Sequence, residues 1–199
     1  MGGVPAIREV QFSIIQNRGC FGGCNFCAIQ LHQGRRVTSR SADSIVAEAE
    51  RMTHEPDFKG YIHDIGGPTA NFRFPSCREQ MLRGMCNGGK HCLAPQTCSH
   101  MIVDHSDYLK ILRRVRELPG VKKVFIRSGI RFDYLMADPD DTFFKELVEY
   151  HVSGQLKVAP EHCAPNTLAY MGKPPIETFN KFKDKFYELS KKAGKKQYL

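Results

Sequence analysis

The sequence predicts an α/β fold built on a parallel sheet, and three observations support this. Short runs of β-branched and aromatic residues alternate along the chain with longer segments whose apolar residues recur at helical spacing. Several strand-like runs end in loops that contain glycine. The 199 residues, 41% of them hydrophobic, suffice for one globular domain with a core. We therefore expect right-handed helical crossovers and ligands at the carboxyl ends of the strands.

The first part of the chain predicts two strands and a helix between them. Residues 10–16 form a buried strand that runs directly into a cysteine-rich loop. Ser41 caps a helix that Pro56 ends. Residues 60–66 form the second strand, and the chain then turns through a loop that begins with Gly66, Gly67 and Pro68. Two strands in succession thus finish in glycine loops, which suggests one shared ligand.

Residues 71–103 break this pattern, because they show little periodicity and contain four cysteines among glycine, proline and basic residues. We interpret them as an insertion within a single domain that spans residues 1–199. Beyond it we expect a helix over residues 108–118, a strand over 123–128, a helix that opens at Asp138 and Pro139, a strand over 156–159, a helix from about 175 to 193 and the start of a strand at 197–199. The incomplete last unit predicts that the chain is a fragment, since a half-made strand leaves a sheet edge unpaired.

Composition bounds the function only loosely. The net charge of +8 fits an anionic ligand or a nucleic-acid partner, and it equally fits an ordinary surface. No run of about 18 apolar residues and no signal-peptide pattern occurs, so we expect a cytoplasmic protein without a membrane span. The eight cysteines allow four disulfides in a secreted domain. Because nothing in the sequence indicates an oxidising compartment, metal binding is the favoured interpretation.

Three cysteines, Cys20, Cys24 and Cys27, follow the first predicted strand at x3 and x2 spacing. Glycines in the same loop allow the backbone to turn the three thiolates toward one metal centre. Three protein ligands leave one metal position open, and an open position is typical of catalytic rather than structural sites. We interpret the loop as the site of an iron–sulfur cluster. The alternative is a zinc site completed by His32 or a fourth cysteine.

The C-x3-C-x2-C spacing, with Phe26 directly before the last cysteine and a strand before the loop, resembles the radical S-adenosylmethionine (SAM) superfamily. The resemblance implies a [4Fe-4S] cluster on the three cysteines and SAM on the open iron. It also implies reductive cleavage of SAM to methionine and a 5′-deoxyadenosyl radical, which abstracts hydrogen from a substrate. The implied fold is a partial (β/α) TIM-like barrel, here truncated after about four β/α units. The implied electron donor is a protein such as flavodoxin or ferredoxin.

The resemblance also implies cofactor-binding roles for residues outside the cysteine loop. Phe26 matches the aromatic position near the adenine of SAM. The family's Gly-Gly-Glu loop, which contacts the methionine amino group, corresponds to Gly66, Gly67 and Pro68, with proline in place of glutamate. Ser128 and Arg131 follow the third main strand, where polar residues reach the ribose and the carboxylate, and Glu161 follows the fourth.

A narrower resemblance is to the YgiQ-type (UPF0313) branch of this superfamily. It rests on residues 129–134, residues 158–162 and the cysteine-rich insertion. Proteins of this branch are longer than 199 residues, which agrees with the expectation of a fragment. The branch does not name the substrate, so a small molecule, RNA and protein all stay open.

The four cysteines of the insertion, Cys77, Cys86, Cys92 and Cys98, have x8, x5 and x5 spacing. This spacing matches neither zinc fingers nor ferredoxins, and it leaves zinc, a second cluster and free thiols as interpretations. Together with the charge of +8, the insertion motivates a competing function. In that alternative the protein is a non-catalytic zinc or iron–sulfur module that binds nucleic acid.

Overall fold

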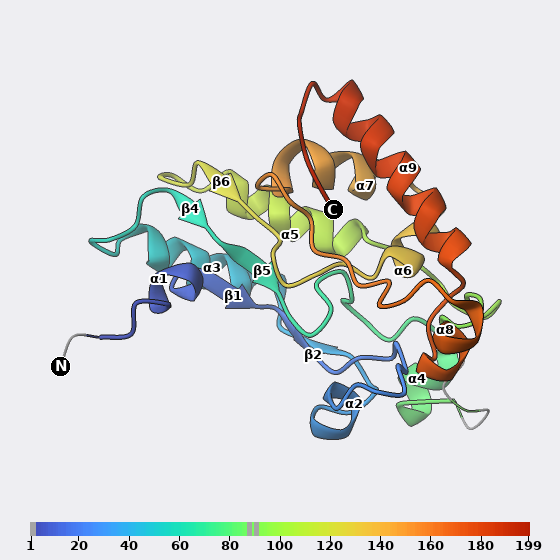
Figure 1. Ribbon diagram of the computed structural model, residues 1–199. Helices are drawn as coiled ribbons and strands as arrows, with labels where there is room; N and C mark the ends of the chain where they lie inside the picture. Colours follow the sequence, from blue (N-terminus) through green and yellow to red (C-terminus); the bar gives the residue numbers. More distant parts are fainter. Residues whose placement is uncertain (1–2, 87–88, 90–91) are drawn as a thin grey trace.

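The computed structural model describes residues 3–86, 89 and 92–199 (Figure 1). Its helices are α1 (Ile7–Val10), α2 (Ile29–His32), α3 (Ala42–Thr53), α4 (Arg78–Arg83), α5 (Ser106–Arg116), α6 (Phe132–Met136), α7 (Thr142–Glu146), α8 (Pro165–Met171) and α9 (Ile176–Lys192), and a π-helical segment, η1 (Leu147–His151), continues α7. Its strands are β1 (Ser13–Ile15), β2 (Asn17–Arg18), β3 (Thr38–Ser39), β4 (Tyr61–Ile62), β5 (Asp64–Gly66) and β6 (Lys123–Val124).

Strands β1, β4, β5 and β6 form parallel pairs. Strand β1 pairs with β5, with Ile14 opposite Ile65, and β4 pairs with β6, with Ile62 opposite Val124. The backbone N–H of Ile65 donates to the carbonyl of Phe125 at 3.2 Å, so the two pairs are neighbours. Parallel strands need a crossover between them, and α3 and α5 lie in the two connections. The predicted α/β class is thus confirmed.

Beyond β6 the parallel arrangement continues only as single contacts. Ile130 pairs with Val158 and Gln155 with Tyr198, both in parallel orientation. The predicted strand over residues 156–159 is therefore reduced to isolated pairs. The partial (β/α) TIM-like barrel remains a prediction that is consistent with this order of neighbours.

One core lies between the strands and the longer helices. Ser41 caps α3 by accepting a hydrogen bond from the Ser44 N–H at 3.2 Å, as predicted. Ile45 and Ala49 are then buried one turn apart on the face of α3 that meets α5. In Figure 1, α5, α7 and α9 gather on one side of the molecule, where buried phenylalanines of α7 and α9 join this core.

Three predicted boundaries are wrong. Val10 belongs to α1 and is exposed, because the chain first makes a helical turn in which the Gln11 N–H donates to the Ile7 carbonyl at 2.8 Å. The strand starts only at Ser13. The predicted strand over residues 123–128 is regular only over β6. The helix expected at Asp138 begins at Thr142, whose N–H donates to the Asp140 carboxylate at 2.9 Å in the preceding turn.

The insertion is packed more firmly than its sequence suggests. It contains α4, and its side chains Phe72, Leu93 and Val103 form a second hydrophobic cluster with Phe21 and Tyr134. The rings of Phe21 and Phe72 stack with centroids 3.8 Å apart. Because Phe21 belongs to the cysteine loop, the insertion supports that loop directly.

Within the part of the chain that the structure describes, no helix is long and apolar enough to cross a membrane.

Candidate functional site

The cysteine loop connects two short antiparallel strands, β2 and β3, which hold its ends together. The N–H of Gly19 donates to the side-chain oxygen of Gln33 at 3.2 Å, and the N–H of Cys20 donates to the carbonyl of Gly34 at 3.1 Å. Gly19 has a φ of +82°, and a Cβ there would lie 2.1 Å from the Arg36 carbonyl oxygen. Only glycine fits at this crossing of the two chain segments.

The far side of the loop is held by α8. The N–H of Asn25 donates to the carbonyl of Met171 at 2.9 Å, and its side chain donates to the carbonyl of Tyr170 at 2.7 Å. These carbonyls lie in the last turn of α8, where they have no partner within the helix. Although α8 is far from the cysteine loop in sequence, it therefore fixes Asn25, which lies between Cys24 and Cys27.

The three cysteines of the loop are free and half-buried. Cys20 Sγ lies 3.5 Å from Thr69 Oγ1, and Cys24 Sγ accepts a hydrogen bond from Arg131 Nη1 at 3.2 Å. Among the described residues, no three His, Cys, Asp or Glu side chains already stand in a metal-binding arrangement. Convergence of Cys20, Cys24 and Cys27 on one centre therefore stays a prediction.

Arg131 is buried and fully engaged. Its Nε and Nη2 donate to the two oxygens of Asp133 at 2.8 and 2.6 Å, which leaves Nη1 for Cys24. Burial disfavours the charge, but Asp133, Cys24 and Cys20 favour it more strongly, and the pKa of Arg131 is raised. The structure thus places Arg131, which the sequence analysis assigned to the region near the ribose and carboxylate of SAM, beside Cys24.

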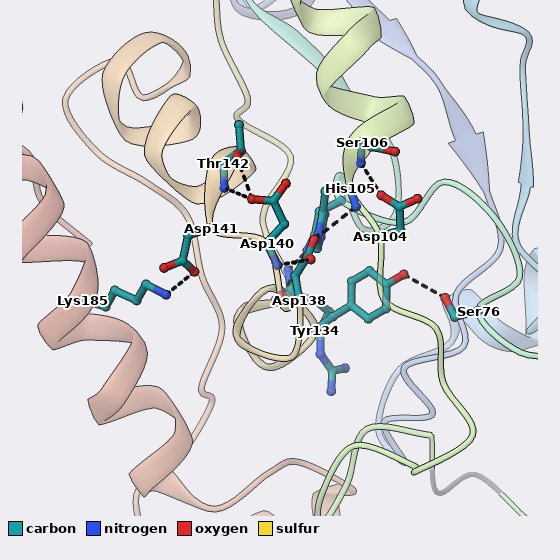
Figure 2. A network of polar contacts seen from close by, with 12 residues as sticks. Ser76, Asp104, His105, Ser106, Tyr134, Asp138, Asp140, Asp141, Thr142 and Lys185 are labelled. Carbon is teal, nitrogen blue, oxygen red and sulfur yellow. Dashed lines mark hydrogen bonds and ion pairs between the residues drawn. The ribbon is translucent and has the colours of Figure 1, made fainter.

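A polar network behind Arg131 fixes its backbone. Asn71 accepts from the Arg131 N–H at 2.9 Å through its side-chain oxygen and contacts His105 Nε2 at 3.1 Å through its nitrogen. These partners make Nε2 the acceptor, so Nδ1 carries the proton that it donates to Asp138 at 2.5 Å. Figure 2 shows His105 beside Asp138, and the hydroxyl groups of Tyr134 and Ser76 hydrogen-bonded to each other at 2.9 Å in the same group.

The Gly66-Gly67 loop lies against two polar side chains. A Cβ at Gly66 would lie 1.7 Å from Ser128 Oγ, and one at Gly67 would lie 1.8 Å from Asn17 Oδ1. The N–H of Gly67 donates to Ser128 Oγ at 3.2 Å. Asn17 Oδ1 is buried without a hydrogen-bond partner among the described residues. An unpaired buried acceptor next to this loop is what a donor group of a ligand would satisfy.

A cavity of about 260 Å³ opens at this loop. Its lining includes Gly66, Gly67, Pro68 and Ser128, so the structure brings together four of the seven predicted cofactor residues. Asp64 also lines it, and burial raises the pKa of this carboxyl although the N–H groups of Arg127 and Ser128 donate to it.

Phe26 and Glu161 meet at Lys173 rather than in the cavity lining. The Phe26 ring is 52% exposed, and the Lys173 ammonium lies 5.7 Å from its centroid. Lys173 Nζ also lies 3.6 Å from a Glu161 carboxylate oxygen and donates to the Ala159 carbonyl at 2.8 Å. Glu161 has a φ of +74°, the one positive value among the described residues other than glycine. Backbone strain of this kind often marks a functional segment.

The four cysteines of the insertion differ in how far they are buried. Cys77 and Cys92 are buried, Cys98 is half-buried and Cys86 is exposed. Burial raises the pKa of the Cys92 thiol. A second metal site at these four cysteines therefore stays a prediction.

Sequence reasoning missed four residues that the structure places at the site. Asn17 and Thr69 are polar residues that follow the predicted strands 10–16 and 60–66, and that position could have marked them, whereas Asp64 is the first residue of β5 and lies inside the predicted strand. Lys173 carried no such signal, because α8 is short and its approach to the cysteine loop is a tertiary contact.

Comparison with known proteins adds two findings. The family model described as the Radical SAM superfamily matches residues 14–196. Over 198 residues the chain is 64% identical to a UPF0313 protein of Clostridium perfringens and 57% identical to one of Clostridium botulinum (strain Okra / Type B1). Each comparison covers 100% of this chain but only 30% and 31% of the respective relative. The chain thus spans about three tenths of the length of these relatives.

Proposed function

The chain belongs to the radical SAM superfamily, in its UPF0313 branch, and from this premise we propose that it is the core of a radical SAM enzyme. In this proposal Cys20, Cys24 and Cys27 hold a [4Fe-4S] cluster with one open iron. A cluster held there, once reduced by one electron from a donor such as flavodoxin or ferredoxin, would supply the electron for breaking the C5′–S bond of SAM to methionine and a 5′-deoxyadenosyl radical, which would take hydrogen from the substrate.

One contact carries the proposal. Cys20 Sγ lies 3.5 Å from Thr69 Oγ1, directly after Gly66-Gly67-Pro68. The thiols that suit iron and the glycine loop that suits an amino acid group are therefore neighbours in space, although Cys20 and Thr69 are 49 residues apart in sequence.

The residues at the glycine loop fit the methionine end of SAM. Neither Gly66 nor Gly67 has room for a side chain, so the backbone of this loop packs directly against Ser128 and Asn17 at the edge of the cavity. The unpaired Asn17 Oδ1 can accept a hydrogen bond from an ammonium group. We assign Asn17 and the Gly66–Pro68 loop to the amino group, and Ser128 positions the loop by accepting from the Gly67 N–H.

The roles of the other predicted residues follow from their contacts. Arg131 holds positive charge against Cys24 and is paired with Asp133, so we assign it to the cysteines rather than to the SAM carboxylate. Phe26 is exposed beside Lys173, where a ring can stack on an adenine base. Glu161 lies on the same side, held by Lys173.

The proposed architecture is the partial (β/α) barrel. A second cavity, of about 640 Å³, is lined by Asp64 and Ser128 together with Lys157 and Leu199. It adjoins the glycine-loop cavity through the shared residues Asp64 and Ser128. We assign it to the interior face, through which the substrate approaches the cofactor.

The test is anaerobic reconstitution with iron and sulfide, followed by chemical reduction with SAM present. We expect 5′-deoxyadenosine and methionine, measured by mass spectrometry. The UPF0313 protein of Clostridium perfringens, assayed in parallel, separates loss of turnover in the shorter chain from absence of the chemistry. A colourless protein that retains zinc, with no cleavage by either protein, would support the nucleic-acid module instead, which gains nothing from the family match.

A further inference from the structure

A buried positive charge without a carboxylate partner among the described residues lies against the cysteine-rich insertion. Arg35 is 8% exposed, and none of the ion pairs formed by residues 3–86, 89 and 92–199 includes it. Its Nη1 donates to the Gly89 carbonyl at 3.2 Å, and its Nη2 donates to Cys92 Sγ at 3.8 Å. Its Nε is buried with no hydrogen-bond partner in the described chain. A guanidinium stays charged in proteins, so this environment requires negative charge nearby.

Gln80 joins two of the cysteine sulfurs. Its backbone N–H donates to Cys77 Sγ at 3.4 Å, and its side-chain Nε2 donates to Cys92 Sγ at 3.6 Å. The Gln80 side-chain oxygen accepts from the Ser76 N–H at 2.8 Å, which fixes the orientation of the amide. N–H groups aimed at sulfur stabilise a thiolate more than a thiol, and such donors commonly surround metal-bound thiolates.

A third cysteine folds back onto this pair. The N–H of Cys98 donates to the carbonyl of Cys92 at 2.9 Å, which closes the loop between them. Cys92 is thus joined to Cys98 through the backbone and to Cys77 through Gln80, which donates to both sulfurs. Three sulfurs, one guanidinium and a fixed amide therefore share one region at the base of the insertion.

We propose that Cys77, Cys92 and Cys98 bind one zinc ion, with Cys86 as the fourth ligand. Structural zinc sites are closed by four ligands, and thiolates are their commonest donors. Cys86 follows the end of α4 and is exposed, so its side chain is free to turn inward. Arg35 and the N–H groups of Gln80 offset the negative charge of four thiolates.

The zinc ion would fasten the insertion to the cysteine loop that precedes it. Arg35 belongs to the segment between Cys27 and β3, whereas Cys92 belongs to the insertion. Metal binding is coupled to folding in small segments of this kind, because the site does not exist in the unfolded chain. The proposed zinc site is independent of the radical chemistry, and each stands or falls by its own test.

The first test measures metal in a variant that lacks the other candidate site. The triple variant Cys20→Ser/Cys24→Ser/Cys27→Ser, purified without added metal, should retain about one zinc per chain by elemental analysis. Adding Cys92→Ser should reduce zinc at least tenfold, and adding Cys163→Ser, an exposed cysteine outside both sets, should leave it unchanged. Zinc that survives Cys92→Ser, no zinc in the triple variant, or iron and sulfide in its place would each overturn the proposal.

The second test needs no substitution, so misfolding of a variant cannot obscure it. Cys86 and Cys163 are both exposed, and without zinc both should react with iodoacetamide at similar rates. In the chain loaded with Zn²⁺ alone, we expect Cys86 to react at least tenfold more slowly than Cys163 until a chelator is added. If the two react equally fast in the loaded chain, Cys86 is not a ligand. Slow reaction of Cys86 in the loaded chain supports the four-cysteine site. His100, whose Nδ1 lies 3.8 Å from Cys98 Sγ, is the alternative fourth ligand, and with it in that role Cys86 would stay as reactive as Cys163.

Discussion

Arg131 Nη1 donates a hydrogen bond to Cys24 Sγ at 3.2 Å, while Asp133 holds the rest of the guanidinium. A buried cation is therefore fixed against one proposed cluster ligand. Positive charge and hydrogen bonds at the sulfur ligands stabilise the more negative, reduced form of a cluster and raise its reduction potential. The contact thus connects a residue after the third main strand with the electron transfer that the proposed reaction needs.

We expect the double variant Arg131→Gln/Asp133→Asn to lower the reduction potential of the reconstituted cluster. Changing both residues avoids an unpaired buried carboxylate. If removal of the charged donor costs the reduced form about 1 kcal/mol more than the oxidised form, the potential falls by about 40 mV. Electron paramagnetic resonance during a redox titration measures the shift.

Arg114→Lys is the control for this substitution, because Arg114 is an exposed arginine paired with Asp43 at 2.8 Å, far from the cysteines in sequence. The reduction potential of the cluster in Arg114→Lys should equal that in the unaltered chain. An unchanged potential in the double variant, with the cluster fully assembled, would remove Arg131 from the electrostatics of the site.

Cys24→Ala should abolish cluster assembly, since two thiolates leave two of the four irons without a protein ligand and do not hold the cluster firmly. We expect iron after reconstitution to fall from about four atoms per chain to below about one. Cys163→Ala, an exposed cysteine outside the loop, should assemble normally. A Cys24→Ala protein that keeps a full complement of iron and sulfide would contradict the ligand assignment.

Much of the fold was predictable because long amphipathic segments repeat one signal many times. The helix α9 was expected from about 175 to 193 and is observed as Ile176–Lys192, with Phe182 and Phe186 buried one turn apart. The short elements had no such signal. Strand β6 has two residues and α6 has five, and tertiary contacts rather than their own periodicity decide their limits.

The candidate site likewise has one part that the sequence predicts and another part that it does not. The spacing of Cys20, Cys24 and Cys27 and the pair Gly66-Gly67 were visible because they are local in sequence. The contacts that orient them join residues far apart, such as Asn25 with Met171 and Asn17 with Gly67. No pattern within a short window reports such contacts.

Gly67→Ala should weaken SAM binding while leaving the cluster in place. Its Cβ would lie 1.8 Å from Asn17 Oδ1 and 3.0 Å from the Asn17 carbonyl oxygen, so the loop must move. A displacement that costs about 1.4 kcal/mol of binding free energy weakens the affinity tenfold, which calorimetric titration of the reconstituted chain resolves. Gly194→Ala is the control for backbone strain away from the site: a Cβ there meets no atom within 4 Å but the φ is +66°, so this variant should be less stable and yet bind SAM with unaltered affinity. Unaltered affinity in Gly67→Ala would separate this loop from the cofactor.

Glu161 should show backbone strain when two of its variants are compared. Both Glu161→Ala and Glu161→Gly remove the carboxylate that lies 3.6 Å from Lys173, but only glycine adopts a φ of +74° without steric cost. We therefore expect the glycine variant to have the higher free energy of unfolding, by about 1 kcal/mol, in urea denaturation. Equal stability of the two variants would show that this conformation is not strained.

His151 should make the chain less stable as the pH falls below about 6.5. The imidazole is fully buried in η1, and its Nδ1 donates to the Val124 carbonyl at 2.8 Å. Burial, with a contribution from Arg116, lowers its pKa from 6.5 to about 4. Between these values the unfolded chain binds a proton that the folded chain does not, so the free energy of unfolding decreases toward acid pH.

The shift corresponds to a loss of up to about 3 kcal/mol between pH 6.5 and pH 4, and urea denaturation at a series of pH values measures it. His151→Asn is the matched variant, because the asparagine nitrogen can still donate to the Val124 carbonyl but does not titrate in this range. The difference in stability between the two proteins should therefore change across the interval, with the unaltered chain losing more. If both lose stability in parallel, carboxyl groups whose pKa is lowered in the fold, such as Glu146 beside Arg113, govern the acid response rather than His151, because only a group present in one protein alone can change their difference.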